Sequence, residues 1–232
     1  MAKAKKVEPP IKIGTSLAAR REQAARVNEL LAKAYPDAKC ALIHDSPLQL
    51  LIATMLSAQC TDARVNMVTP GLFKKYPDAA SFAKASQEEI ETEIRSTGFY
   101  RNKARSIREA SHDILEKYEG QVPSTLEELT GLRGVGRKTA NVVLGNAFDV
   151  PGMVVDTHVM RLSQRLGLTR EKTPEKIELD LMPLMSEKLW VIFGHQLILH
   201  GRKYCKAPNP NCTGCPLLEI CPYPGKRFKN PL

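Results

Sequence analysis

Long hydrophobic runs are missing from this sequence of 232 residues. No stretch approaches the roughly 18 apolar residues that a membrane span needs, and the most apolar candidate, residues 122–144, is interrupted by proline, glycine, arginine and lysine. The lysine-rich start, ahead of Pro9 and Pro10, also lacks the apolar core of a secretory signal. We therefore expect a cytoplasmic protein that contacts no membrane.

Strand-like alternation, internal repeats and low-complexity segments are also scarce. Apolar residues instead return at intervals of three and four, which predicts amphipathic helices and an all-α fold. Hydrophobic residues make up 43% of the chain and charged residues 25%, as in a folded globular protein with a sizeable core. From the length we expect two lobes.

Capping residues mark several helix starts. Ser46 before Pro47 predicts an N-cap followed by proline in the first turn of a helix that runs to about residue 59. Thr61 is a candidate cap for the next helix, and Ser86 with Glu89 fits a capping box. Further helices are predicted over residues 102–118, 124–129, 137–147, from 156 onward, and over 174–185 and 187–200.

Charge favours a polyanionic partner. The sequence has 34 Lys and Arg against 25 Asp and Glu, a formal net charge of +9. Such an excess indicates nucleic acid first, although a generic basic surface would give the same count. Lysine-rich termini would add non-specific affinity.

The most informative segment is the glycine-containing turn at residues 132–138. Gly134 and Gly136 allow positive φ angles and leave backbone N–H groups unshielded at the start of the next helix. Those groups form an anion site suited to one DNA phosphate, whatever the base sequence. A plain corner between two helices is the alternative.

Two residues near this turn can carry chemistry. Lys138 lies in the first turn of the helix beside Arg137, where the helix end and the neighbouring cation favour a neutral, nucleophilic amine. Asp156 precedes a predicted helix, where a carboxylate can face Lys138 across a cleft and handle protons or positive charge. A solvent-exposed lysine and a simple N-cap are the structural alternatives.

Four of the six cysteines follow the pattern Cys-X6-Cys-X2-Cys-X5-Cys: Cys205, Cys212, Cys215 and Cys221. Four thiolates on one proline-rich loop can hold either tetrahedral zinc or a [4Fe–4S] cluster, and disulfides are a weaker alternative in a reducing compartment. Cys40 and Cys60 are expected to be buried apolar residues.

These motifs together resemble the endonuclease III family within the helix-hairpin-helix DNA glycosylase superfamily. The resemblance rests on residues 132–141, 155–158 and 55–59 and on the cysteine spacing, and it covers residues 20 to 221. It implies a two-lobed, all-α fold with a C-terminal iron–sulfur loop. One lobe, with six helices, would span residues 40–150, and the other would combine 1–39 with 151–232, with the site between them.

The resemblance also implies residue roles. Lys138 matches the family's Schiff-base lysine, Asp156 its catalytic aspartate, and the four cysteines its [4Fe–4S] ligands. Gln59 matches a residue that fills the gap left by a flipped nucleotide, and Phe99 stands where relatives carry an aliphatic wedge. The implied activity is removal of oxidised pyrimidines from damaged double-stranded DNA with β-elimination at the lesion. We expect a monomer associated with the bacterial nucleoid.

The sequence departs from the family pattern at two places, and two other functions are alternatives. Arg133 replaces a proline common before the hairpin glycines and is expected to add a cation near the phosphate, while the 205–212 loop carries Lys206 as its only basic residue. An adenine-mismatch glycosylase would generally lack Lys138 and carry glutamate where Ala53 stands. A non-catalytic, zinc-stabilised DNA-binding module would lose no activity on substitution of Lys138.

Overall fold

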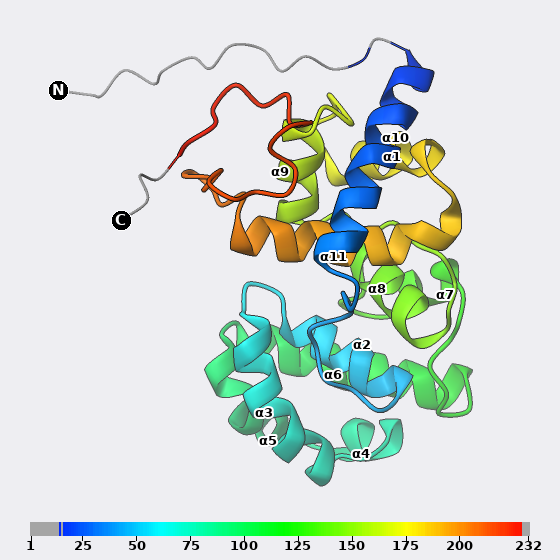
Figure 1. Ribbon diagram of the computed structural model, residues 1–232. Helices are drawn as coiled ribbons and strands as arrows, with labels where there is room; N and C mark the ends of the chain where they lie inside the picture. The colour runs from blue at the N-terminus through cyan, green and yellow to red at the C-terminus, as the bar shows by residue number, and fades with distance from the viewer. Residues whose placement is uncertain (1–13, 15, 229–232) are drawn as a thin grey trace, which may run out of the picture. The chain divides into compact units, whose positions relative to one another are not determined.

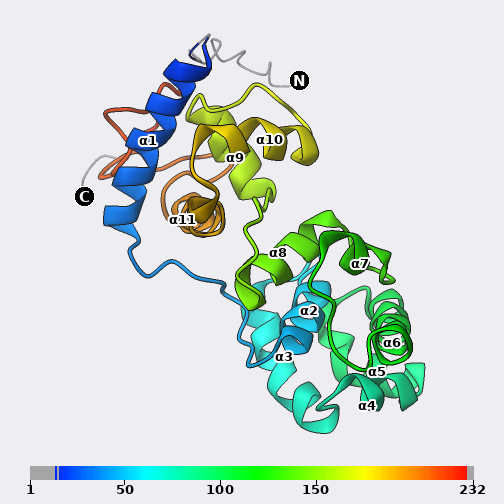
Figure 2. The ribbon, with the colours of Figure 1, turned by 90° about the vertical axis from the view of Figure 1, so that its right-hand side faces the viewer.

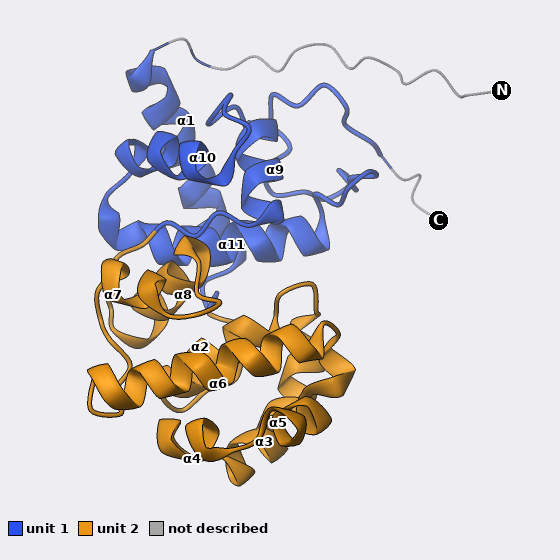
Figure 3. Cartoon of the chain, turned by 180° about the vertical axis from the view of Figure 1, so that it is seen from behind, with its two compact units in different colours: residues 1–39, 153–232 blue, residues 40–152 orange. Residues whose placement is uncertain are grey.

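The computed structural model describes residues 14 and 16–228. All regular elements within that part of the chain are helices, so the predicted all-α class is confirmed. The chain divides into two compact units, one of residues 1–39 with 153–232 and one of residues 40–152 (Figures 1 and 3). No helix in the described ranges is long and apolar enough to cross a membrane.

Unit 2, residues 40–152, is built around one long helix. It contains α2 Pro47–Leu56, α3 Asp62–Lys75, α4 Ala79–Lys84, α5 Gln87–Ile94, the 3₁₀ helix η1 Arg95–Thr97, α6 Tyr100–Lys117, α7 Leu126–Gly131 and α8 Arg137–Ala147. Helix α6 packs against α2, α4 and α5, and α8 packs against α2 and α7 (Figure 3). The hairpin of α7 and α8 is thereby fixed to the apolar helix α2.

The core of unit 2 forms where these helices meet. Helix α2 is apolar almost all round, and residues 50–56 are all buried. Helix α6 is amphipathic instead, with Ala104, Ile107, Ala110 and Ile114 on its buried face. A helix buried on every side, such as α2, is held by neighbours on several faces, which makes its C-terminal end a rigid support for the following turn.

Unit 1 joins segments from both ends of the chain. It contains α1 Leu17–Ala34, α9 Thr157–Arg165, α10 Pro174–Leu181, the 3₁₀ helices η2 Met182–Leu184 and η3 Glu187–Leu189, and α11 Trp190–Lys203. Helix α11 lies between α1 and α9, which both pack against it (Figure 2). The cysteine loop follows α11 without further helix to residue 228.

The predicted caps are confirmed. Ser46 accepts a hydrogen bond from the Gln49 backbone, Thr61 caps α3, and both bonds of the Ser86 and Glu89 capping box are present. Each cap is a local interaction across three residues, which explains why the sequence alone placed it.

Some element boundaries differ from the expectation. Helix α2 stops at Leu56 rather than near residue 59, and α6 begins at residue 100 rather than 102. The sequence pattern does not predict helices α1 and α4. With α4, unit 2 has seven α-helices rather than the expected six, and every residue of unit 2 is described. Helix α4 has only six residues, too few to show a helical period, and its stability comes from packing on α6.

Candidate functional site

The turn between α7 and α8 is anchored by two apolar side chains. Leu132 and Val135 are buried, and the Val135 N–H donates to the Leu132 carbonyl at 3.1 Å. Gly134 has φ +76°, and a Cβ built there would approach Ser106 of α6 to 2.7 Å. Glycine is therefore required at 134 both by backbone conformation and by close packing.

Gly136 has a different role from Gly134. Its φ is −90°, so of the two glycines only Gly134 uses the left-handed region that the sequence allowed for both. Gly136 is the N-cap residue of α8, no side chain caps that helix, and a Cβ at 136 would meet nothing within 4 Å. The first N–H groups of α8 thus have no side-chain cap and lie beside an open surface, as an anion site requires.

Lys138 is the second residue of α8. Its side chain is exposed and forms no salt bridge with any described residue. It lies in the helix turn that starts at Gly136, so an anion held by the α8 N-terminus would be close to the amine. The predicted nucleophile and the predicted phosphate site therefore share one helix turn.

Asp156 lies in unit 1 and caps α9. Its Oδ1 accepts hydrogen bonds from the His158 and Val159 backbone N–H groups, each at 2.8 Å. The side chain is half-buried, and both bonds fall on one oxygen. The capping alternative for Asp156 is thus real, and it fixes the carboxylate without using Oδ2 in those bonds.

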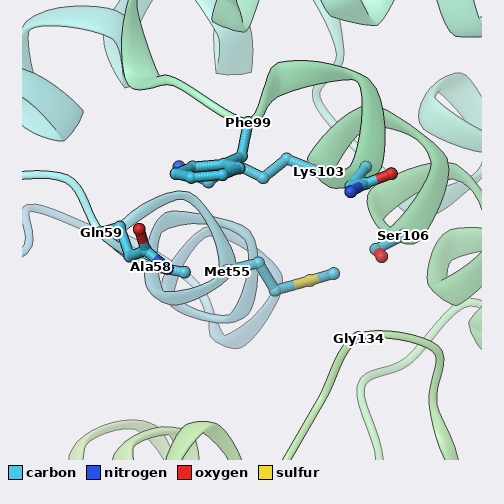
Figure 4. A pocket seen from close by; sticks show the side chains of 8 residues that line it. Met55, Ala58, Gln59, Phe99, Lys103, Ser106 and Gly134 are labelled. Carbon is cyan, nitrogen blue, oxygen red and sulfur yellow. The ribbon is translucent and has the colours of Figure 1, made fainter.

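Three of the predicted DNA-contacting residues line one pocket of unit 2. The pocket contains Gln59, Phe99 and Gly134 (Figure 4), and its remaining lining residues are Met55, Ala58, Asn102, Lys103 and Ser106. Met55 and Ala58 come from α2 and its end, while Phe99 to Ser106 come from the start of α6. The turn after α2, the start of α6 and the hairpin therefore meet at one surface.

Gln59 and Phe99 share an uncommon backbone conformation. Their φ angles are +52° and +49°, and Phe99 remains 62% exposed. A non-glycine residue held in the left-handed region costs about 1 to 3 kcal/mol and persists where the surrounding structure enforces it. Two such residues beside one pocket, one of them an exposed aromatic, are features of a binding surface rather than of a stable core.

Sequence reasoning missed Lys103. The residue is buried, and its Nζ donates to the Leu56 carbonyl at 2.8 Å and to the Thr97 carbonyl at 2.9 Å. A signal was available, because Lys103 lies four residues before Ile107 on the apolar face of α6. A lysine in such a position requires buried partners.

Arg133, in the hairpin turn, lies beside an acidic side chain of α6. Its Nε lies 3.6 Å from Oε2 of Glu109 on α6, with the two side chains 60% and 44% exposed. The sequence predicts an added cation near the phosphate, which stays a prediction; the carboxylate from α6 offsets part of that charge. The pairing could not be foreseen from residues 24 positions apart.

The four cysteines of the C-terminal loop line a single pocket. None of the four forms a disulfide. Among the described residues, no three His, Cys, Asp or Glu side chains are placed to hold a single metal ion. Four cysteine thiols gathered at one pocket are a donor set that can serve either a zinc ion or an iron–sulfur cluster.

Hydrogen-bond donors lie beside two of the four sulfurs. Arg165 Nη1 lies 3.3 Å from Cys205 Sγ, and the Arg227 backbone N–H donates to Cys212 Sγ at 3.3 Å. Burial raises the pKa of the Cys215 thiol to about 11. Partly buried thiols with donors directed at sulfur are suited to a bound cation that compensates the thiolate charge.

Cys40 and Cys60 are half-buried rather than fully buried, and both pack against the core of unit 2. Burial raises the pKa of Cys40, which favours the neutral thiol. Their apolar, non-ligand interpretation fits this environment.

The chain is similar to base excision repair proteins. Residues 52–187 match the family model of the HhH-GPD superfamily base excision DNA repair protein. Endonuclease III of Synechocystis sp. is 51% identical over 207 residues, which are 89% of this chain and 94% of that protein.

Solved structures give the same result. A non-covalent endonuclease III–DNA complex is 48% identical, with a TM-score of 0.83, and the match covers 87% of this chain and 94% of that one. A trapped covalent endonuclease III–DNA intermediate, an estranged-adenine complex, has the same identity and TM-score and covers 87% and 95%.

Proposed function

Because the chain belongs to the endonuclease III family of helix-hairpin-helix base excision repair proteins, and so is a DNA glycosylase with AP lyase activity, we propose that Lys138 and Asp156 carry its chemistry. The proposed substrates are oxidised pyrimidines in duplex DNA. The net charge of +9 supports a polyanionic partner. Such a substrate implies work on nucleoid DNA, which we propose the protein performs as a monomer.

Lys138 is the proposed nucleophile. Its neutral amine attacks C1′ of the extruded nucleotide, the C1′–N glycosidic bond breaks, and its electron pair leaves with the base, which takes up a proton. The C1′–O4′ bond then breaks, O4′ takes up a proton, and a Schiff base forms between C1′ and Nζ. Loss of a C2′ proton breaks the C3′–O bond and nicks the strand. The exposed amine in the first turn of α8 supports this role, as does the covalent complex of a relative.

Asp156 is the proposed partner in proton transfer. A carboxylate stabilises the positive charge that develops on the sugar as the base leaves, and it can accept a proton from the attacking amine. The two backbone bonds to Oδ1 support the proposal, because they hold the side chain in one orientation.

The hairpin and the pocket residues are the proposed DNA contacts. Backbone N–H groups at Gly134 and Gly136 would bind a phosphate, which positions the strand without reading its sequence. Gln59 would occupy the gap left by the extruded nucleotide and hydrogen-bond the orphaned base, while Phe99 would stack between bases. Their exposed, left-handed turns beside one pocket support these roles.

The cysteine loop is the proposed site of a [4Fe–4S] cluster held by Cys205, Cys212, Cys215 and Cys221. When bound, the cluster would order the loop and its basic residues. Iron, acid-labile sulfide and zinc analysis of the purified protein tests this assignment. Four iron and four sulfide per chain are expected, whereas stoichiometric zinc without iron would contradict it.

The observation that carries the proposal is Lys138, exposed in the first turn of a helix whose N-terminus lacks a side-chain cap. Borohydride trapping on duplex DNA with one oxidised pyrimidine tests it, with Lys138→Gln as the variant. Lys74→Gln, at an exposed lysine of the same unit, is the matched control. We expect covalent trapping of the wild type and of Lys74→Gln, and no trapping of Lys138→Gln. Trapping by Lys138→Gln would assign the nucleophile elsewhere, and excision by the wild type without any trapping would indicate a monofunctional glycosylase.

A further inference from the structure

Lys103 is a buried cation that the proposed chemistry does not use. Its side chain is 7% exposed and forms no salt bridge with any residue that the structure describes. Instead, Nζ donates to two backbone carbonyls, those of Leu56 and Thr97, at 2.8 and 2.9 Å. A buried charge held by carbonyl dipoles alone is costly, so a role beyond filling space is expected of it.

Both carbonyls belong to the ends of helices. Leu56 is the last residue of α2 and Thr97 the last of η1, where carbonyl groups have no partner within the helix and carry partial negative charge. One ammonium group therefore caps two helix ends at once. Burial lowers the pKa of Lys103, and the nearby Cys60 opposes that shift.

Each capped end leads directly into a strained turn. Gln59 follows Leu56 by three residues and Phe99 follows Thr97 by two, and both have left-handed backbone conformations. Lys103 lines the same pocket as these two residues (Figure 4). The single bond network at Nζ thus connects the two turns that carry the proposed DNA-inserting side chains.

We propose that Lys103 is a positioning residue that holds the Gln59 and Phe99 turns together, so that both side chains enter the duplex in a fixed arrangement. This inference rests on the proposed DNA contacts of Gln59 and Phe99. Without the ammonium group, the two carbonyls would separate or take up water, and each turn could relax from its strained conformation.

A second nucleophilic role for Lys103 does not fit the geometry. Attack on a sugar carbon requires a neutral amine with access to the substrate. The Lys103 Nζ is buried and uses two of its hydrogens on carbonyl groups. Positioning is the role that its bonds support.

The first test is single-turnover excision from duplex DNA bearing an oxidised pyrimidine. Lys103→Met removes the charge and all donors while keeping a similar apolar stem. Displacement of positioned groups by about 1 Å can cost a hundredfold in rate, and we expect a loss of about 10- to 100-fold. Lys74→Met, which removes an exposed charge from the same unit, is the matched control and should excise like the wild type.

A double-mutant cycle separates positioning from simple stabilisation. If Lys103 acts through Gln59, then Gln59→Ala should lower the excision rate by a much smaller factor in the Lys103→Met background than in the wild type. Fluorescence of 2-aminopurine opposite the lesion, measured in a Lys138→Gln background, should change on binding and lose most of that change with Lys103→Met. Should Lys103→Met fail to fold, Lys103→Gln, with a shorter neutral side chain, replaces it.

The outcomes distinguish the inference from its premise. If Gln59→Ala and Phe99→Ala excise like the wild type, their proposed contacts fail and the inference fails with them. If those variants lose activity while the folded Lys103 variant keeps wild-type excision and fluorescence, only the inference is overturned. Additive losses in the cycle would also overturn it, because they indicate a stabilising role alone.

Discussion

A Cβ atom on Gly134 would lie 2.7 Å from the Cβ of Ser106, so the hairpin turn rests directly on α6. The same helix supplies Lys103 and begins immediately after Phe99. Helix α6 therefore serves as a common base for the hairpin and for the proposed wedge. The turn cannot accept a side chain at 134 without moving relative to that base.

Substitution of the two hairpin glycines should have different effects. Gly134→Ala places a side chain at φ +76° and against Ser106, and it should lower the free energy of unfolding by about 2 kcal/mol or more. Gly136→Ala meets open space at φ −90° and should change stability by less than about 0.5 kcal/mol. Urea denaturation measures both.

DNA affinity gives the complementary readout for Gly136. If a phosphate approaches the α8 N-terminus there, the added methyl group of Gly136→Ala should weaken binding to undamaged duplex DNA despite an intact fold. Unchanged affinity in a filter-binding titration would place the phosphate elsewhere.

Substitution of Asp156 should separate capping from chemistry. Asparagine is as good an N-cap as aspartate, so Asp156→Asn should leave thermal stability near that of the wild type while lowering the excision rate by about 10² to 10⁴. Asp156→Ala should lose the same activity and about 1 kcal/mol of stability in addition. Single-turnover kinetics and calorimetry provide the two readouts, and an active Asp156→Asn would leave the residue with a capping role only.

The pairing of Arg133 with Glu109 predicts that Arg133→Gln affects the salt dependence of DNA binding less than Glu109→Gln does. The charge of Arg133 is offset by a carboxylate. Arg133→Gln should therefore change the free energy of unfolding by no more than about 0.5 kcal/mol, and it should leave the salt dependence of DNA binding unchanged. Glu109→Gln releases the guanidinium and should steepen the slope of log K against log salt by up to about 0.9. A slope that falls with Arg133→Gln would mean that the arginine binds phosphate.

Acid should weaken the fold through His195 of α11. Burial lowers the pKa of His195 below its ordinary 6.5. As pH falls through 6.5, the unfolded chain binds a proton that the folded chain resists, so the free energy of unfolding decreases below that pH and is unaffected by this group above it. His195→Gln should reduce the fall in the free energy of unfolding between pH 7.5 and 5.5. His112→Gln, at an exposed histidine, is the control. If His195→Gln leaves the pH dependence of the free energy of unfolding unchanged, the burial of His195 does not govern that dependence.

Local sequence patterns determined much of this protein. The helix class, the caps at Ser46, Thr61 and Ser86, and the hairpin turn all depend on residues a few positions apart, and those interactions form whatever surrounds them. The candidate nucleophile and the four cysteines were likewise apparent from residue type and spacing.

Tertiary structure decided the features that depend on distant contacts. Lys103 became informative only when the ends of α2 and η1 met at its ammonium group, across a separation of 47 residues to Leu56. The pairing of Arg133 with Glu109 and the short helix α4 depend in the same way on packing against α6. A buried charge and an ion pair derive their energies from the three-dimensional surroundings, and a one-dimensional pattern does not contain those surroundings.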